Sequence, residues 1–204
     1  MAVQSFSQFT EMHTSVLQEL GNMGSGGAAT ALADMLGTPT DISVPAVKMV
    51  GLEEARKLIN TLCGVAHSVL VTLSGDIKGY ILHIMPYKYT ERVIETYFPG
   101  VSVSTAADID EMGTSVINEV VNITSGAYVN TLAQLTGMFI DISTPQRYEN
   151  TAEEIFKNYP AGENALYFVN NTLIISDKCQ KSNLLFFPEL ESIKQVMGRL
   201  GIEC

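Results

Sequence analysis

The sequence predicts an α/β protein, an α+β sandwich in which two similar halves share one antiparallel or mixed sheet. Three observations carry this prediction. The chain has 204 residues, 46% hydrophobic and 17% charged, so it is long enough to bury a core and too apolar to stay disordered. Its second half repeats a pattern of the first half 100 positions later. Each half runs from a long helix through strands to a closing helix, which predicts that the halves pack together.

The repeat is clearest in residues 15–45, which align with residues 115–145 without a gap. Polar and small residues recur as well as apolar ones, and such recurrence is hard to obtain by chance. We expect a single domain over 1–204, built from halves 1–100 and 101–204, because each half has few strands with which to close its own core. The recurring pairs include Ser15/Ser115, Glu19/Glu119, Asn22/Asn122, Ser25/Ser125, Gly26/Gly126, Leu32/Leu132, Gly37/Gly137 and Pro45/Pro145.

The remaining elements of the first half follow from periodicity and turn residues. A helical pattern covers Leu52–Leu62. Two strand-like runs, His67–Leu73 and Gly79–Met85, are separated by a Ser-Gly-Asp turn signal. Proline is favoured in the first turn of a helix, so Pro86 is predicted to open a helix that ends near Tyr97. Residues 98–106 then connect the halves.

The second half has a similar but weaker pattern. A charged segment, Thr151–Asn158, is predicted to be helical. Strands are predicted over Ala165–Val169, Thr172–Ser176 and Asn183–Phe187. A closing helix is predicted over Glu191–Leu200.

The recurring Glu and Asn lie on one stripe of each long helix. A helix turns about 100° per residue, so spacings of 4, 3 and 4 align Ser15, Glu19, Asn22 and Gly26, and likewise their second copies. Packing does not dictate this face, so its repetition indicates a shared task; the alternative is a solvated surface retained after duplication. The predicted core face holds Val16, Leu17, Leu20, Met23, Gly24, Gly27, Ala28, Ala31 and Met35, and then Val116, Ile117, Val120, Ile123, Ala127, Leu132 and Leu135.

Glu and Asn together permit only a limited chemistry. No Ser/His/Asp or Cys/His set accompanies them, and a lone Glu binds metal weakly. An Asn amide can accept a hydrogen bond from water and donate one to a phosphoryl oxygen, and an amide side chain orients the attacking water in some phosphoryl transfers. A carboxylate can hold a lysine through a charge-assisted hydrogen bond. The stripe is then half of a site, completed by a phosphorylated partner that carries its own metal.

Charge and composition exclude several other classes. Twelve basic and 22 acidic side chains give a net charge of −10, which disfavours nucleic-acid binding because that needs a basic face. No signal peptide and no apolar run of membrane-spanning length is visible, so we expect a cytoplasmic protein without membrane insertion. The three cysteines and three histidines show no zinc spacing, so each histidine is expected to be a packing or surface residue and no metal of the protein's own is expected.

Two further features are expected to be structural. The segment Gly24–Gly27 lacks the Lys-Ser/Thr of a phosphate-binding loop and follows no predicted strand, so it indicates either close helix packing or close approach of a partner. Pro45 and Pro145 are expected to stop or shape a strand edge.

The doubled pattern Ser-x3-Glu-x2-Asn-x22-Pro resembles the signature of the CheC/CheX/FliY family of bacterial chemotaxis phosphatases. It occurs at Ser15, Glu19, Asn22 and Pro45, and again at Ser115, Glu119, Asn122 and Pro145. Two intact motifs in about 200 residues are typical of CheC-type members. Gly27 stands where the family often has Asn, and Val121 where the second motif often has Gly. Such changes alter helix geometry, so the two sites are expected to differ in activity.

The resemblance implies two long helices side by side on a six-stranded sheet, and dephosphorylation of the response regulator CheY in two-component signalling. Glu19 and Glu119 would each hold the regulator's active-site lysine. Asn22 and Asn122 would each place water for attack on its aspartyl phosphate. The regulator would supply Mg²⁺, and the deamidase CheD is an expected second partner. The alternatives are a non-catalytic adaptor that binds CheD or a flagellar switch component, and a stand-alone metal hydrolase.

Overall fold

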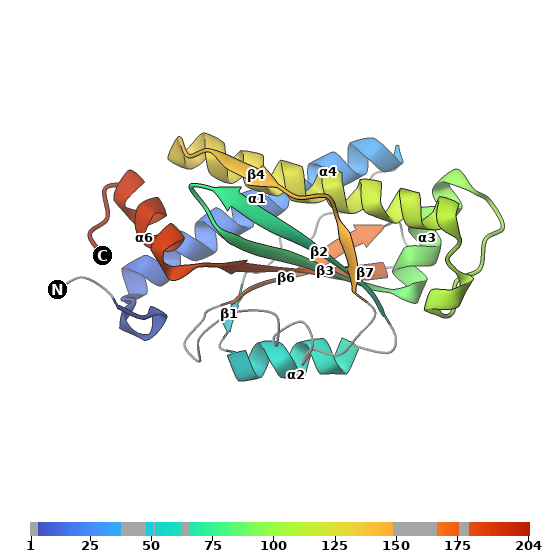
Figure 1. Cartoon of the computed structure of the whole chain (residues 1–204), viewed down its shortest axis with the longest axis horizontal. Coiled ribbons are helices and arrows are strands. Elements are labelled where there is room, and N and C mark those ends of the chain that lie inside the picture. The colour runs from blue at the N-terminus through green and yellow to red at the C-terminus, as the bar shows by residue number, and fades with distance from the viewer. Residues whose placement is uncertain (1–3, 38–47, 51, 63–65, 149–166, 176–179) are drawn as a thin grey trace.

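The computed structural model describes residues 4–37, 48–50, 52–62, 66–148, 167–175 and 180–204. The first half contains helices and strands in the predicted order, and Figure 1 shows their arrangement. Its elements are the 3₁₀ helix Phe6–Gln8, α1 (Glu11–Leu36), β1 (Lys48–Val50), α2 (Leu52–Leu62), β2 (Ala66–Gly75), β3 (Gly79–Pro86) and α3 (Tyr87–Tyr97). The helices predicted over Leu52–Leu62 and up to Tyr97, and both predicted strands, are confirmed.

The second half follows the same order. Its elements are the 3₁₀ helix Ala106–Asp108, α4 (Glu111–Thr136), β4 (Ile140–Ile142), β5 (Gln146–Tyr148), β6 (Tyr167–Ile175), β7 (Gln180–Pro188) and α6 (Leu190–Arg199). The closing helix and the last strand are confirmed, and the predicted helix Thr151–Asn158 lies outside the described residues. The break predicted between residues 169 and 172 is wrong. Strand β6 continues through these residues. Its pairing with β7 shifts in register between Asn170 and Leu173, so the polar Asn-Asn-Thr segment lies within the strand and forms no turn.

The described strands form one sheet in the order β1-β6-β7-β3-β2, with β4 and β5 both paired to β2 at the far edge. Every pairing between described strands is antiparallel. Strands β3 and β7 meet at the centre, one from each half. Each outermost strand pairs with the other half of the chain, β1 with β6 and β4–β5 with β2. The halves therefore share one sheet, as predicted.

The strand count is seven rather than the six expected, because one edge strand is interrupted. Ser143 lies in the gap between β4 and β5. Its backbone N–H donates to the Thr72 carbonyl at 2.9 Å, and its hydroxyl oxygen accepts from the Thr72 N–H at 3.0 Å. Pro145 follows and has no N–H to donate to a ladder, so pairing resumes only at Gln146. The prediction that Pro145 shapes a strand edge is confirmed, whereas Pro45 lies outside the described residues.

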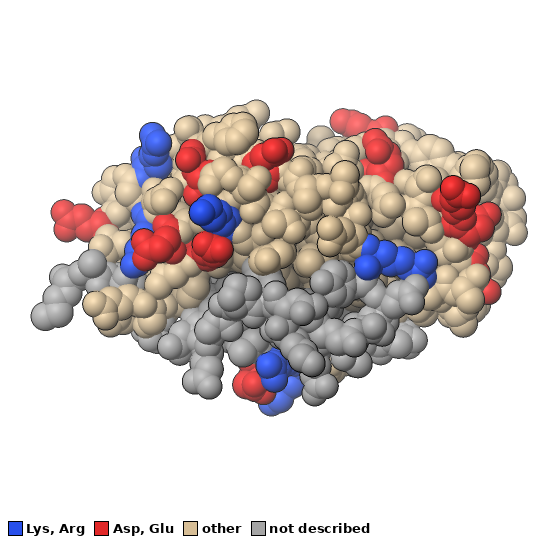
Figure 2. All heavy atoms as spheres, viewed as in Figure 1, with Lys and Arg blue, Asp and Glu red and all other residues tan. Residues whose placement is uncertain are grey.

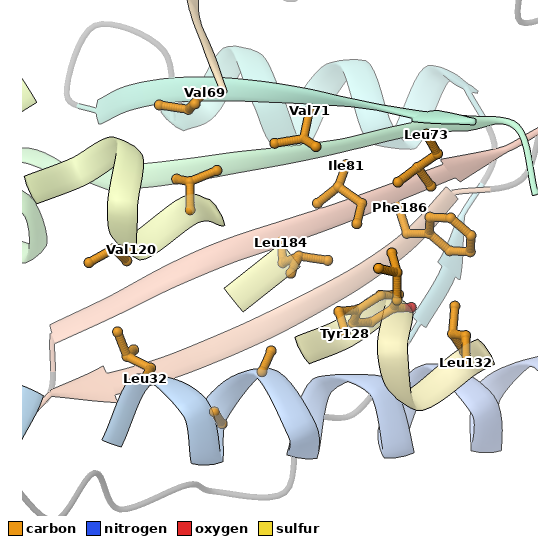
Figure 3. Close-up of a cluster of buried hydrophobic side chains, with 14 of the residues drawn as sticks. Leu32, Val69, Val71, Leu73, Ile81, Val120, Tyr128, Leu132, Leu184 and Phe186 are labelled. Atoms are coloured by element: carbon orange, nitrogen blue, oxygen red, sulfur yellow. The ribbon is translucent and has the colours of Figure 1, made fainter. Parts of the chain in front are cut away.

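The two long helices cover one face of the sheet, and α2 lies on the other face (Figure 1). Side chains of alternate strand residues point toward α1 and α4 and form the main core, part of which Figure 3 shows. That core includes Val69, Val71, Leu73, Ile81, Leu184 and Phe186 from the strands, and Leu32, Val120, Tyr128 and Leu132 from the helices. The sheet therefore forms a rigid support under both motif-bearing helices.

Two residues assigned to the core face are instead exposed. Met23 is 42% exposed and Leu135 is 37% exposed. Met23 lies four residues after Glu19, so it is about 40° from that side chain on a helix and belongs to the outward face. The prediction placed it in the core by residue type rather than by angle.

Candidate functional site

The α1 stripe lies on the outward face of a well-capped helix. Ser15 and Glu19 are exposed, and Asn22 is half-buried. The Thr10 N–H donates to Nδ1 of His13 at 3.0 Å, so that nitrogen carries no proton in this bond. The other ring nitrogen, Nε2, then donates to the Glu203 carbonyl at 2.9 Å. His13 thus joins the start of α1 to the C-terminal segment and fixes where the stripe begins.

The α4 stripe is similar but more open. Ser115, Glu119 and Asn122 are all exposed. The helix is capped by Asp110, whose side chain accepts from the Gly113 N–H at 2.7 Å. Within the described part of the chain, the Asn122 carboxamide has no hydrogen-bond partner, so it is available to a bound molecule.

The distance between α1 and α4 is set by glycines of α1. A Cβ added to Gly24 would lie 2.8 Å from the ring of Tyr128, a buried residue of α4. A Cβ added to Gly27 would collide with the hydroxyl of Thr131. Close helix packing, one of the two explanations for Gly24–Gly27, is therefore confirmed for these two glycines. Gly27 stands where the family often has Asn. The local packing explains this difference, because an Asn side chain in that place would meet Thr131.

The recurring serines beneath the stripes are structural. The Ser25 hydroxyl donates to the carbonyl of Gly21 within its own helix at 2.7 Å. The Ser125 hydroxyl instead lies 2.8 Å from Nε2 of His83 on the central strand β3. Burial lowers the pKa of His83 from 6.5 to about 3, so the ring is neutral at physiological pH. The sequence predicts a packing or a surface role for each histidine. His83 has a packing role, and it links α4 directly to the sheet.

Of the two motif prolines, only Pro145 lies in the part of the chain that the structure describes. Pro145 is half-buried between β4 and β5, beside the interrupted edge of the sheet. Ile142, at the end of β4, has its Cδ1 atom 3.9 Å from where a Cβ of Gly126 would lie. The segment leading to Pro145 therefore borders the α4 stripe. The corresponding segment before Pro45 lies outside the described residues.

Sequence reasoning missed one pair of surface residues. Met12 is 63% exposed and Met112 is 56% exposed, in the first turn of α1 and α4. Their recurrence 100 positions apart was the signal that could have found them, because large apolar side chains are otherwise rarely repeated on a solvated face.

Within the described ranges, no group of three or more His, Cys, Asp or Glu side chains is arranged to hold a metal ion. None of the described helices combines the length and apolar character needed to cross a bilayer.

The sheet with its two covering helices has the fold of the CheX and FliY chemotaxis proteins, and each covering helix carries an outward Glu/Asn pair. The model of the CheC-like family matches residues 12–49 and 112–149, which include both stripes. This match confirms the family resemblance that the doubled motif predicted.

Relatives and solved structures agree with this assignment. The chain is 26% identical to a Bacillus subtilis protein named CheY-P phosphatase CheC, over 96% of this chain and 97% of the relative. The crystal structure of Thermotoga maritima FliY matches with a TM-score of 0.70 at 22% identity, covering 95% of this chain and 98% of that one. A CheX–CheY–BeF3–Mg²⁺ complex from Borrelia burgdorferi matches with a TM-score of 0.54 at 22% identity, covering 81% and 95%. These structural likenesses show the fold.

Proposed function

We propose that this protein dephosphorylates phosphorylated CheY at two sites, one on α1 and one on α4. The observation that carries the proposal is the repeated placement of an exposed Glu and, three residues later, an Asn on the outward face of both helices. A full-length relative named as a CheY-P phosphatase supports the choice of substrate. The proposal treats the chain as one domain with two halves, each half carrying one site.

At each site, the regulator supplies the phosphoryl group and this protein supplies the orientation of water. The Asn22 or Asn122 carbonyl oxygen accepts a hydrogen bond from water, while the amide N–H₂ donates to a phosphoryl oxygen. Water attacks phosphorus in line with the aspartyl oxygen. The P–O bond to that oxygen breaks, which leaves a free aspartate carboxylate and inorganic phosphate, and the water proton leaves with the phosphate.

The carboxylates of Glu19 and Glu119 have a binding role in this scheme. Each is exposed and accepts a charge-assisted hydrogen bond from a lysine beside the regulator's phosphoaspartate. Mg²⁺ is bound by the regulator and neutralises charge on the phosphoryl oxygens. In this scheme the protein acts on a partner that carries the metal.

The direct test is the lifetime of the phosphorylated regulator of the same organism. The wild-type protein should shorten this lifetime, and Asn22→Ala combined with Asn122→Ala should reduce the acceleration by about 100-fold, the lower range for a positioned polar group. Asn130→Ala is a matched control, because Asn130 is an exposed Asn of α4 outside the motif. An unchanged acceleration in the double variant would refute the assigned role of the two Asn residues.

CheD is proposed as a second partner and the cytoplasm as the location, both on the family resemblance. If the protein binds CheD but never shortens the lifetime of the phosphorylated regulator, even with CheD present, the adaptor alternative replaces the phosphatase.

A further inference from the structure

Ser125 is bonded differently from the other hydroxyl residues of the two long helices. Most of these hydroxyls donate to the carbonyl four residues earlier in their own helix, namely those of Thr14, Ser25, Thr30, Thr124, Thr131 and Thr136. Such a bond satisfies the hydroxyl and ties the helix to nothing else. The Ser125 Oγ instead lies 2.8 Å from Nε2 of His83 on β3, so this bond joins α4 to the sheet.

His83 is a fixed point within the sheet. It pairs with Val69 of β2 on one side and with Leu184 of β7 on the other. Side chains two residues apart on a strand share a face, so His83 points to the same side as Ile81, which belongs to the core beneath the helices. Ser125 is therefore bonded to a residue that strands on both sides hold in place.

The bond between these two residues contributes direction more than stability. Ser125 is 0% exposed and His83 is 1% exposed. A buried hydrogen bond contributes only about 1 kcal/mol net, and apolar groups of the same shape in both places would be about as stable. Apolar contacts are non-directional, whereas a hydrogen bond sets a distance and an angle. Burial lowers the pKa of His83 to about 3, so the ring is neutral and the bond persists near neutral pH.

The part of α4 that His83 holds is the part that carries Asn122. Ser125 follows Asn122 by three residues, so the two side chains are neighbours on the helix, about 60° apart. Asn122 is exposed and Ser125 is buried, so one position faces outward while the other is bonded to the sheet. A shift of this turn would move Asn122 with it, and a misplacement of about 1 Å can slow a reaction roughly 100-fold.

Helix α1 has the same serine without this anchor. Ser25 is also 0% exposed, but its hydroxyl donates to the Gly21 carbonyl at 2.7 Å. Among the residues that the structure describes, Ser25 makes no bond to the sheet. Asn22 and Asn122 therefore recur in sequence but are supported differently.

We propose that His83 and Ser125 are positioning residues for Asn122, and that their hydrogen bond holds the α4 site in the geometry that orients water. Neither side chain touches the phosphoryl group. The α1 site works without an equivalent bond. This inference rests on the proposed function, because it concerns how the Asn of one site is held while the phosphorylated regulator is bound.

Proteins with a single working site test this inference, because a general weakening of the fold would affect both sites alike. Asn22→Ala leaves the α4 site, and Asn122→Ala leaves the α1 site. In the Asn22→Ala protein, adding His83→Leu with Ser125→Ala should lower kcat about tenfold. Adding Ser125→Ala alone, which also removes the bond, should lower it by a similar factor. In the Asn122→Ala protein, the same additions should leave kcat unchanged.

KM separates positioning from docking in these measurements. Both substituted side chains are buried, so the acidic side chains that Figure 2 shows along the upper part of the molecule, where Figure 1 places α4, stay unchanged. The KM for the phosphorylated regulator should therefore change less than twofold while kcat falls.

Two control variants complete the test in the Asn22→Ala protein. His83→Gln should keep kcat within twofold, because the Gln amide can still form a hydrogen bond with the Ser125 hydroxyl. Ser25→Ala should also leave kcat unchanged, because it removes the matched serine of α1, which is not bonded to the sheet. Loss of kcat in His83→Leu with Ser125→Ala, together with its retention in His83→Gln, would support the positioning role.

The outcomes distinguish this inference from the proposed function. If the α4 site keeps its kcat without the bond, or if both single-site proteins lose kcat equally, the inference is wrong and the proposed function stands. If Asn22→Ala alone abolishes activity, the α4 site does not act and the inference is likewise wrong, while the α1 site remains. A wild type that never shortens the lifetime of the phosphorylated regulator refutes the proposed function and the inference with it.

Discussion

Helices α1 and α4 have the same length and the same outward stripe, but they differ in how they are held. At the third helical position, His13 joins α1 to the C-terminal segment, whereas Gly113 lets α3 approach α4, with Ile94 Cδ1 3.0 Å from where its Cβ would lie. At the crossing, α1 contributes Gly24 and α4 contributes Tyr128.

The outward residues of the two helices are repeated, whereas the buried residues at their crossing are not. The outward Glu, Asn, Met and Gly recur although packing does not require them, while buried partners at the helix crossing differ between the halves. A helix pair can be packed in many ways, as long as a large residue on one helix faces a small one on the other. The surface residues that recur are therefore the better guide to function in this chain. The buried residues that differ between the helices are positions at which one helix can be substituted with no equivalent change in the other.

The largest expected effect comes from the crossing. Tyr128→Ala should destabilise the protein by about 3–5 kcal/mol, because it removes a fully buried aromatic ring packed against Phe186 and leaves a cavity. Urea unfolding at pH 7 measures this. Ala28→Gly is the matched control, since Ala28 occupies the equivalent place on α1, and it should cost only about 1 kcal/mol for the helical glycine plus a small packing loss.

The next effect tests which glycine of α1 the packing against α4 requires. Gly24→Ala should destabilise the protein by about 1–3 kcal/mol, because its methyl group would overlap the Tyr128 ring. Gly26→Ala, two residues away, should instead stabilise it by about 0.5–1 kcal/mol, since its methyl group meets no atom of the described residues within 4 Å. In a Tyr128→Ala background, the penalty of Gly24→Ala should disappear. A penalty that persists there would show that the two residues are not coupled.

The third effect is a dependence of stability on pH that should come from His83, which contacts α4, and from His67 on β2. Burial lowers the pKa of His83 to about 3, and burial with the charge of Arg147 lowers that of His67 to about 4, both from 6.5. As pH falls below 6.5, the unfolded chain binds protons that the folded protein does not bind. Stability is therefore lost down to about pH 3 for His83 and about pH 4 for His67. At pH 5.5, one unit below the ordinary value, each histidine should remove about 1.4 kcal/mol relative to pH 7.5.

Unfolding free energies at pH 7.5 and 5.5 check this. His83→Leu with Ser125→Ala should abolish the His83 share of the loss, because it removes the titrating ring and the hydroxyl it leaves behind. Ser25→Ala, on the other helix, should leave the pH dependence as it is, since Ser25 bonds only within α1. An identical pH dependence in the His83 variant would show that His83 is not the group that titrates.

The smallest expected effect is the difference between the two sites. Asn122 is exposed and Asn22 is half-buried, so Asn122→Ala should remove more of the proposed phosphatase activity than Asn22→Ala does, by about threefold, or roughly 0.6 kcal/mol. The lifetime of the phosphorylated regulator measures each single variant. Equal losses would mean that exposure in the free protein does not decide how well each Asn reaches the phosphoryl group.

Periodicity and turn residues were enough to predict α2, α3, α6 and strands β2, β3 and β7, because each lies between clear start and stop signals. The continuous β6 was missed, since Asn-Asn-Thr is a turn signal that only tertiary pairing overrides. For the candidate site, the stripe could be read from spacing alone. The exposure of Met23 and Met112 was missed although helix angle and recurrence indicate it. The bond between His83 and Ser125 could not be predicted, because it depends on which side of α4 faces the sheet.

Each outermost strand of the sheet belongs to the opposite half, since β1 pairs with β6 and β4–β5 with β2. A polypeptide ending near residue 100 would thus leave β1 without its neighbour and β2 with an open edge. Such a fragment could complete the sheet only by recruiting a second copy of itself in place of residues 101–204. The present chain resembles that homodimer with its two copies joined end to end, so the two copies need not carry the same residue at equivalent buried positions, as Gly24 and Thr124 show.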